Sequence, residues 1–168
     1  MACETLKDCC TTPGRVCKSR NICVIFCENR SIAQCEENRK SYSITNITRQ
    51  YNIALYRIDN GVIPQHEKIH RADYMFVAYK TEGIKAVLVE LKGTDVRHSI
   101  KQIDSTLSKY FDFFSQSCKN VYGRIVCASG VPDIRNDPDY LKLHTKLRKL
   151  NGNLDKKQNS YAESIESI

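Results

Sequence analysis

Short runs in which apolar residues alternate with polar ones dominate the middle of the chain, and they predict strands. One strand is expected over residues 50–59, with apolar side chains on both of its faces. Two more are expected over 71–80 and 84–91, joined by a tight turn at 81–83. Because so short a connection joins only antiparallel neighbours, these three strands form a meander. A fourth strand is expected over 121–129.

Apolar residues at the helical period predict helices on either side of the fourth strand. The first runs from Asp95 to Ser117, and its apolar residues recur on one face: Ile103, Leu107, Tyr110, Phe111 and Phe114. The second begins at Asp137-Pro138-Asp139, where proline suits the first turn, and it ends at Asn151-Gly152. Its apolar stripe consists of Tyr140, Leu143, Leu147 and Leu150. A short helix is also expected over 31–40, with Ser31 as its N-cap.

The predicted order of elements is therefore α-β-β-β-α-β-α. It indicates an α/β (α+β) fold in which helices flank a mixed β-sheet. The length of 168 residues fits one domain of ordinary size. We expect a cysteine-rich N-terminal extension over 1–30, a folded domain over 31–157 and a polar C-terminal tail over 158–168. The end of the chain is expected to hold at most one short edge strand before it frays.

The charge balance adds a candidate partner. The chain has 26 Lys and Arg against 19 Asp and Glu, a net charge of +7. Such an excess favours a polyanion, because Lys and Arg placed against phosphates release condensed counterions. A merely solubilising surface is the other interpretation. No apolar run approaches the roughly 20 residues of a membrane helix, and the N-terminus lacks a basic patch followed by an apolar core. We therefore expect a soluble cytoplasmic protein without a membrane partner.

Cysteines gather at the N-terminus. Seven of the nine fall within the first 35 residues, and their spacings match no zinc ribbon or knuckle: Cys3, Cys9, Cys10, Cys17, Cys23, Cys27 and Cys35. Reduced thiols are the favoured interpretation, because disulfides are rare in a reducing compartment. A structural metal or a redox module over residues 3–35 stays open, as do disulfides.

Three ionisable residues are expected to converge at one end of the predicted meander. Glu90 and Lys92 are two apart, so on a strand their side chains share a face. Asp73 precedes the turn by about as many residues as Glu90 follows it, so the antiparallel pairing places them side by side. Two carboxylates bind Mg²⁺ through hard oxygen ligands. An adjacent lysine can stabilise charge that develops on a phosphate. The structural alternative is a solvated ion pair at a strand end.

This arrangement resembles the PD-(D/E)XK nuclease superfamily, the restriction-endonuclease-like fold, over about residues 31–150. The likeness rests on Asp73 and on Glu90-Leu91-Lys92, placed on the second and third strands of an α-β-β-β-α-β core. The stretch looks like that of small bacterial members. The resemblance implies that Asp73 and Glu90 are metal ligands and that Lys92 is the catalytic lysine.

The same resemblance implies two further site residues. An acidic residue on the first helix is assigned to Glu37, with Glu36 as the neighbour that could replace it, and a glutamine on the helix after the third strand is assigned to Gln102. The chain departs from the family where Ala72 replaces the proline that often precedes the aspartate. It also departs where Thr106 stands in place of the tyrosine of a Gln-x3-Tyr pattern.

The expected function is hydrolysis of phosphodiester bonds in nucleic acid, with DNA as the favoured substrate, by a water activated by Mg²⁺ or Mn²⁺. A homodimer is expected if both strands of a duplex are cut, and membership of a larger defence or repair complex stays open. The alternative is a catalytically silent nuclease fold that binds nucleic acid or a protein partner, because fold does not fix function.

The remaining polar residues receive weaker assignments. Lys142, Lys146 and Lys149 form a row that contacts phosphates or is simply a solvated face. His66 and His70 are expected in an exposed loop. His98 precedes Gln102 by one helical turn and is more simply an exposed histidine than a phosphate ligand.

Overall fold

The computed structural model of the protein describes residues 23–168. The predictions for Cys3, Cys9, Cys10 and Cys17 fall outside these residues. Within the described part, five cysteines are free thiols: Cys23, Cys27, Cys35, Cys118 and Cys127.

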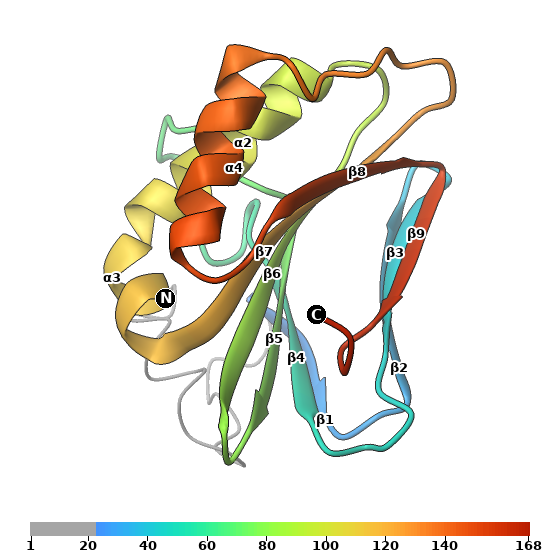
Figure 1. Cartoon of the computed structure of the whole chain (residues 1–168), viewed down its shortest axis with the longest axis vertical. Helices are drawn as coiled ribbons and strands as arrows, with labels where there is room; N and C mark the ends of the chain where they lie inside the picture. Colours follow the sequence, from blue (N-terminus) through green and yellow to red (C-terminus); the bar gives the residue numbers. More distant parts are fainter. Residues whose placement is uncertain (1–22) are drawn as a thin grey trace.

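The molecule is mixed α+β and has three layers (Figure 1). The central layer is a six-stranded sheet in the order β1-β4-β5-β6-β7-β8. Helices α2, α3 and α4 cover one of its faces, and a three-stranded sheet in the order β2-β3-β9 covers the other. The larger sheet comprises β1 (Val24–Glu28), β4 (Asn52–Arg57), β5 (Tyr74–Lys80), β6 (Gly83–Leu91), β7 (Cys118–Cys127) and β8 (Leu154–Gln158). The other elements are β2 (Ile32–Glu37), β3 (Lys40–Thr45), β9 (Ser160–Ser164), α2 (Val96–Lys109), α3 (Phe111–Ser117) and α4 (Pro138–Lys149).

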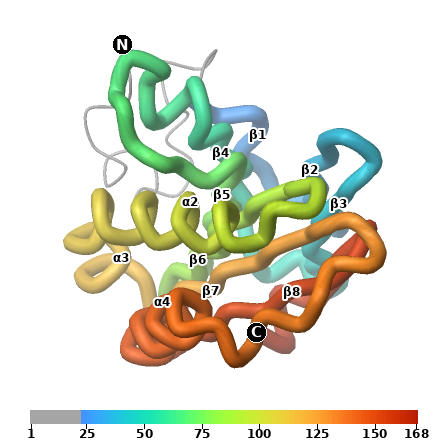
Figure 2. Tube along the Cα trace, turned by 90° about the horizontal axis from the view of Figure 1, so that it is seen from above, coloured from blue at the N-terminus to red at the C-terminus, as the bar shows by residue number. Residues whose placement is uncertain are grey.

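The predicted meander is confirmed. Strands β4, β5 and β6 pair antiparallel in succession, and Tyr74 lies opposite Val89 in the register of β5 and β6. Strands β6, β7 and β8 are parallel. Because of these strand directions, the ends of β4, β6, β7 and β8 and the start of β5 meet at one edge, which we call the carboxyl edge. Viewed from above, α2 and α4 lie side by side against the sheet (Figure 2).

Two apolar clusters hold the layers together, one on each face of the six-stranded sheet. Side chains alternate between them along each strand: in β4, Ile53 and Leu55 join the cluster under the smaller sheet, whereas Ala54 and Tyr56 join the cluster under the helices. This two-sided burial explains why the strand runs carry apolar residues on both faces.

The helix predicted over residues 31–40 is wrong. These residues form strand β2, a turn at Asn38 and Arg39, and the start of β3. Both turn residues have positive φ, 48° and 61°, which suits a two-residue hairpin turn. Ala33 and Cys35 are buried while Gln34 and Glu36 are exposed, so the period is that of a strand. The β2–β3 hairpin thus replaces the first helix of the predicted order.

The long helix predicted from Asp95 to Ser117 is divided at Tyr110. This residue has φ −111° and ψ 26°, outside the helical range, and it separates α2 from α3. The change of direction turns Phe111 to solvent, 49% exposed, and buries Phe113, while Phe114 is buried as predicted. Helix α4 forms where it was predicted, with the Asp137 side chain accepting a hydrogen bond from the Asp139 N–H.

The expected ends of the folded domain need extension in both directions. Val24–Glu28 lies in the larger sheet as β1, although residues 1–30 were predicted as an extension. The predicted polar tail contains β9, which pairs parallel with β3, and it buries Tyr161 and Ile165. The tail is held because these two side chains complete the cluster between the sheets.

None of the helices formed by residues 23–168 has the length and apolar character needed to cross a membrane.

Candidate active site

The register of β5 and β6 brings Asp73 and Glu90 together at the carboxyl edge. Asp73 immediately precedes β5, and Glu90 is the penultimate residue of β6. Because Tyr74 pairs with Val89, Asp73 and Glu90 are the next opposed positions. Glu90 alternates with Val89 and Leu91, which pack under the smaller sheet, so its side chain lies on the helix side.

Each of the two carboxylates accepts a hydrogen bond from a backbone N–H of the opposite strand. The Asp73 N–H donates to Glu90 Oε2 at 3.1 Å, and the Leu91 N–H donates to Asp73 Oδ2 at 2.8 Å. Lys92 Nζ lies 3.5 Å from Glu90 Oε1, and the lysine side chain is 33% exposed. The two carboxylates are thus each fixed by a backbone N–H at the same edge, and the Lys92 ammonium group contacts the carboxylate of Glu90 and also reaches solvent.

The electrostatics of the pair are unfavourable for two bare carboxylates. The pKa of Asp73 is raised to about 6, because burial and the charge of Glu37 outweigh the lowering by the Leu91 N–H and by Lys92. Burial and the charge of Asp73 raise the pKa of Glu90 well above its usual range, and Lys92 only partly opposes this. A cation placed between the two carboxylates would relieve both effects.

Two buried oxygen atoms at this site have no hydrogen-bond partner. They are Oε1 of Glu90, which Lys92 approaches as an ion pair without forming a hydrogen bond, and Oε1 of Gln102, which is 8% exposed. Among the described residues these are the only buried side-chain nitrogen or oxygen atoms in that condition. Both belong to side chains that hold the segment leading into β5, since Gln102 Nε2 donates to the Arg71 carbonyl at 2.9 Å. Buried polar groups normally have a hydrogen-bond partner, so a hydrogen-bond donor or a cation at either oxygen would satisfy it.

Glu37 reaches Asp73 from the other side of the sheet. It lies on the same side of β2 as the buried Cys35, and together with Asp73 it lines a cavity of about 300 Å³. Arg57, Asp59, Asn60 and Tyr74 complete the lining. The assignment of Glu37 to a helix is wrong, because it stands on a strand. Glu36 points away from the larger sheet.

The oxygen donors available to a metal are the carboxylates of Asp73 and Glu90, with that of Glu37 nearby. Within residues 23–168, no three His, Cys, Asp or Glu side chains are already gathered around a single metal position. Carboxylate and amide oxygens are nevertheless the ligands that hard divalent cations prefer. The unpartnered oxygens of Glu90 and Gln102 are of the type that such a cation would accept as ligands.

The other predicted residues are dispersed. Lys146 Nζ pairs with Asp104 of α2 at 2.6 Å, while Lys142 and Lys149 are exposed on α4. The row runs along the helix away from the carboxyl edge. His66 and His70 are exposed in the irregular segment before β5, as predicted. The His70 ring lies edge-on to that of His98, with centroids 4.9 Å apart.

Several residues near the site were missed by the sequence analysis. Arg57 and Asp59 line the cavity beside Asp73, and Arg71 pairs with Asp59 while donating to the carbonyls of Pro64 and Glu67. The local sequence does not distinguish a single charged residue at a strand end as part of a site. The position of Arg57 at the end of β4, the antiparallel neighbour of β5, could have indicated that it lies near Asp73.

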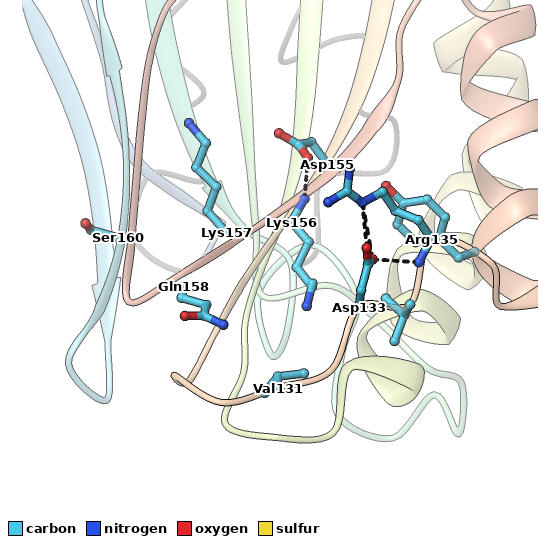
Figure 3. Close-up of a pocket in the computed structure, with 10 residues that line it drawn as sticks. Val131, Asp133, Arg135, Asp155, Lys156, Lys157, Gln158 and Ser160 are labelled. Carbon is cyan, nitrogen blue, oxygen red and sulfur yellow. Dashed lines mark hydrogen bonds and ion pairs between the residues drawn. The ribbon is translucent and has the colours of Figure 1, made fainter.

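A second hollow of about 500 Å³ lies between the loop before α4 and strand β8 (Figure 3). Several of its charged side chains already have polar partners. Asp133 contacts Arg135 at 3.2 Å, Lys156 Nζ donates to the Pro132 carbonyl at 3.0 Å, and Asp155 accepts from the Tyr161 hydroxyl at 2.8 Å. We therefore place the candidate site at Asp73 and Glu90.

No family model, no curated protein and no solved structure matches this chain. Its function has to be inferred from the residues of the site.

Proposed function

We propose that the protein is a metal-dependent phosphodiesterase of the PD-(D/E)XK type that cleaves nucleic acid, with DNA as the favoured substrate. The observation that carries the proposal is the pair of carboxylates at Asp73 and Glu90 beside Lys92, with a buried oxygen of Glu90 that has no hydrogen-bond partner. In a purely structural ion pair this oxygen would have a hydrogen-bond donor. The order β4, β5, β6, α2 and β7 matches the β-β-β-α-β part of a restriction-endonuclease-like core, although the β2–β3 hairpin stands in place of its first helix.

Asp73 and Glu90 are the side chains that would hold Mg²⁺ or Mn²⁺, with Glu37 at the open side. When bound, such an ion neutralises charge on a phosphate and lowers the pKa of a coordinated water. The Leu91 N–H fixes one oxygen of Asp73, and the Asp73 N–H fixes one oxygen of Glu90, which leaves the second oxygen of each for other partners.

Lys92 and Gln102 have separate roles in this proposal. The Lys92 ammonium group is partly exposed beside Glu90, so it can stabilise negative charge on an approaching phosphate without leaving its carboxylate. Gln102 orients the site through the Arg71 carbonyl, and its free Oε1 faces no donor among the described residues.

Calorimetric titration with Mn²⁺ tests the metal site directly. We expect saturable binding at millimolar or lower Mn²⁺, and at least about tenfold weaker binding in Glu90→Ala, because one of the two close carboxylates is removed. Glu82→Ala is the matched control, since Glu82 lies at the opposite end of the same β5–β6 hairpin. Equal affinities of wild type and Glu90→Ala would contradict the assignment.

A second candidate function is binding without cleavage. It is favoured by the existing partners of the carboxylates, since Asp73 and Glu90 accept backbone hydrogen bonds and Lys92 partly offsets the charge of Glu90. This candidate predicts that millimolar Mn²⁺ produces no binding heat, and that plasmid, linear DNA, single-stranded DNA and RNA stay intact in Mg²⁺ or Mn²⁺. Nucleic-acid binding without cleavage, together with a silent titration, would favour this second function over the first.

The lysine row of α4 gives a prediction about affinity. Replacing Lys142, Lys146 and Lys149 by alanine is expected to weaken binding to every nucleic acid. On duplex DNA the salt slope should fall by about 0.9 log unit for each phosphate that is left without its lysine. Mn²⁺ affinity should not change, because α4 supplies no ligand. Arg49→Ala, an exposed cation near the smaller sheet, is the control. An unchanged salt slope in the triple variant would identify the row as a solvated face.

A further inference from the structure

One peptide bond just before Asp73 is held at both of its polar atoms by α2. Gln102 Nε2 donates to the Arg71 carbonyl at 2.9 Å, and the Ala72 N–H donates to Thr106 Oγ1 at 2.8 Å. This carbonyl and this N–H belong to the same peptide unit. Gln102 and Thr106 are one helical turn apart, so both reach the same extended segment from one face of α2.

The direction of the Thr106 hydrogen bonds is fixed by its chemistry. Its hydroxyl proton goes to the Gln102 carbonyl at 2.9 Å, which leaves an oxygen lone pair to accept the Ala72 N–H. Thr106 and Ala72 are fully buried, so water cannot replace either partner. Loss of the hydroxyl would therefore leave the Ala72 N–H buried and unsatisfied.

The geometry points to Thr106 as a positioning residue for Asp73, and we propose that it sets where the Asp73 carboxylate stands. The proposal rests on the proposed function only in taking Asp73 as a metal ligand. The peptide that Thr106 and Gln102 hold ends at the Cα of Ala72, and the next residue is Asp73. The backbone on the other side of Asp73 is fixed by pairing in β5, so the segment is held on both sides.

The proposed role of Thr106 depends on the backbone N–H that alanine provides at position 72. Proline has a fixed φ and no N–H, and would present nothing for the hydroxyl to accept. With alanine, the backbone is free to turn at this position unless the N–H is bound. The buried hydroxyl of Thr106 thus supplies from a neighbouring helix the restraint that a proline would supply within the chain.

The Leu91 amide reports the position of the carboxylate without any metal, because its N–H donates to Asp73 Oδ2. In Thr106→Val we expect hydrogen exchange at Leu91 to accelerate by about tenfold or more relative to amides in the middle of β6, as a weakened local bond opens without global unfolding. Thr106→Ser, which keeps the hydroxyl, should restore the protection. Thr145→Val is the matched control, since Thr145 makes the same bond to its own helix, at 2.8 Å to the Leu141 carbonyl.

Mn²⁺ affinity, measured well below the unfolding temperature, gives the second readout. We expect Thr106→Val to bind about tenfold more weakly than wild type, which is the lower end of the range of about 10–100-fold found when residues that orient metal ligands are replaced. Thr106→Ser and Thr145→Val should bind as wild type does. A residue that only stabilises the fold would lower the melting temperature without moving the affinity of the folded protein.

The double variant Ala72→Pro/Thr106→Val removes both the donor and the acceptor. In the double variant no buried N–H lacks an acceptor, so the protection of the Leu91 amide and the Mn²⁺ affinity should return toward the wild-type values. The effects of the two substitutions should therefore be non-additive. If wild type and Thr106→Val share the same Leu91 exchange rate, the positioning role is overturned. If wild type fails to bind Mn²⁺ but Leu91 protection still depends on the Thr106 hydroxyl, the proposed function fails and the positioning role stands.

Discussion

Asp73→Ala and Lys92→Ala are each expected to reduce nucleic-acid cleavage in Mg²⁺ or Mn²⁺ by about a hundredfold to a thousandfold. Asp73→Ala removes a metal ligand, whereas Lys92→Ala removes positive charge beside the reacting phosphate. Asp73 lies in contact with Glu90, and Lys92 Nζ is 3.5 Å from the same carboxylate. The measurement is the single-turnover rate on plasmid, linear duplex, single-stranded DNA and RNA.

The two variants should differ in their metal dependence. Asp73→Ala removes a ligand, so higher Mn²⁺ should recover part of the missing rate, whereas Lys92→Ala should bind Mn²⁺ as wild type does and stay slow. Glu82→Ala, at the far end of the β5–β6 hairpin, should cleave at the wild-type rate. Cleavage that survives Asp73→Ala or Lys92→Ala would show that the activity arises elsewhere.

Asp73→Asn is expected to stabilise the metal-free protein at pH 8 by about 2–3 kcal/mol, since each pKa unit corresponds to about 1.4 kcal/mol. Burial raises the pKa of Asp73 from 3.8 to about 6. Between about pH 4 and pH 6 the carboxyl of the folded protein therefore keeps a proton that the unfolded chain has already released. Its contribution to stability is complete below about pH 4 and is lost as pH rises through about 6. Asparagine carries no charge and can still accept the Leu91 N–H.

Denaturant unfolding in EDTA at pH 4, 6 and 8 measures this effect. The free energy of unfolding of wild type should fall between pH 4 and pH 8, and the fall should be smaller in Asp73→Asn. Some dependence should persist, because burial also raises the pKa of Glu90. Glu82→Gln, which changes an exposed carboxyl, should follow wild type. Parallel curves for wild type and Asp73→Asn would refute the pKa assignment. Asp73→Asn should therefore stabilise the protein while weakening metal binding, as is expected where function requires the unfavourable burial of a charge.

The sequence by itself determined the elements whose signals are local. Strands β4, β5 and β6 and the turn between the last two follow from alternation and turn residues, and α4 follows from its Asp137 cap, Pro138 and apolar stripe. Counting outward from the turn was enough to bring Asp73 beside Glu90, because antiparallel register is fixed by the turn that closes it.

The tertiary structure alone decided the features that depend on distant residues. Residues 31–40 carry a weak helical pattern, yet they form a hairpin because Ser41 of β3 pairs with Ser160 of β9, at the other end of the chain. Glu37 approaches Asp73 only because that second sheet packs over the first. The orphaned oxygen of Glu90 and the contact of Thr106 with Ala72 likewise arise from the packing of α2 on the sheet. Local windows of sequence record propensity and period, whereas burial and non-local pairing add free energy that only the assembled layers contain.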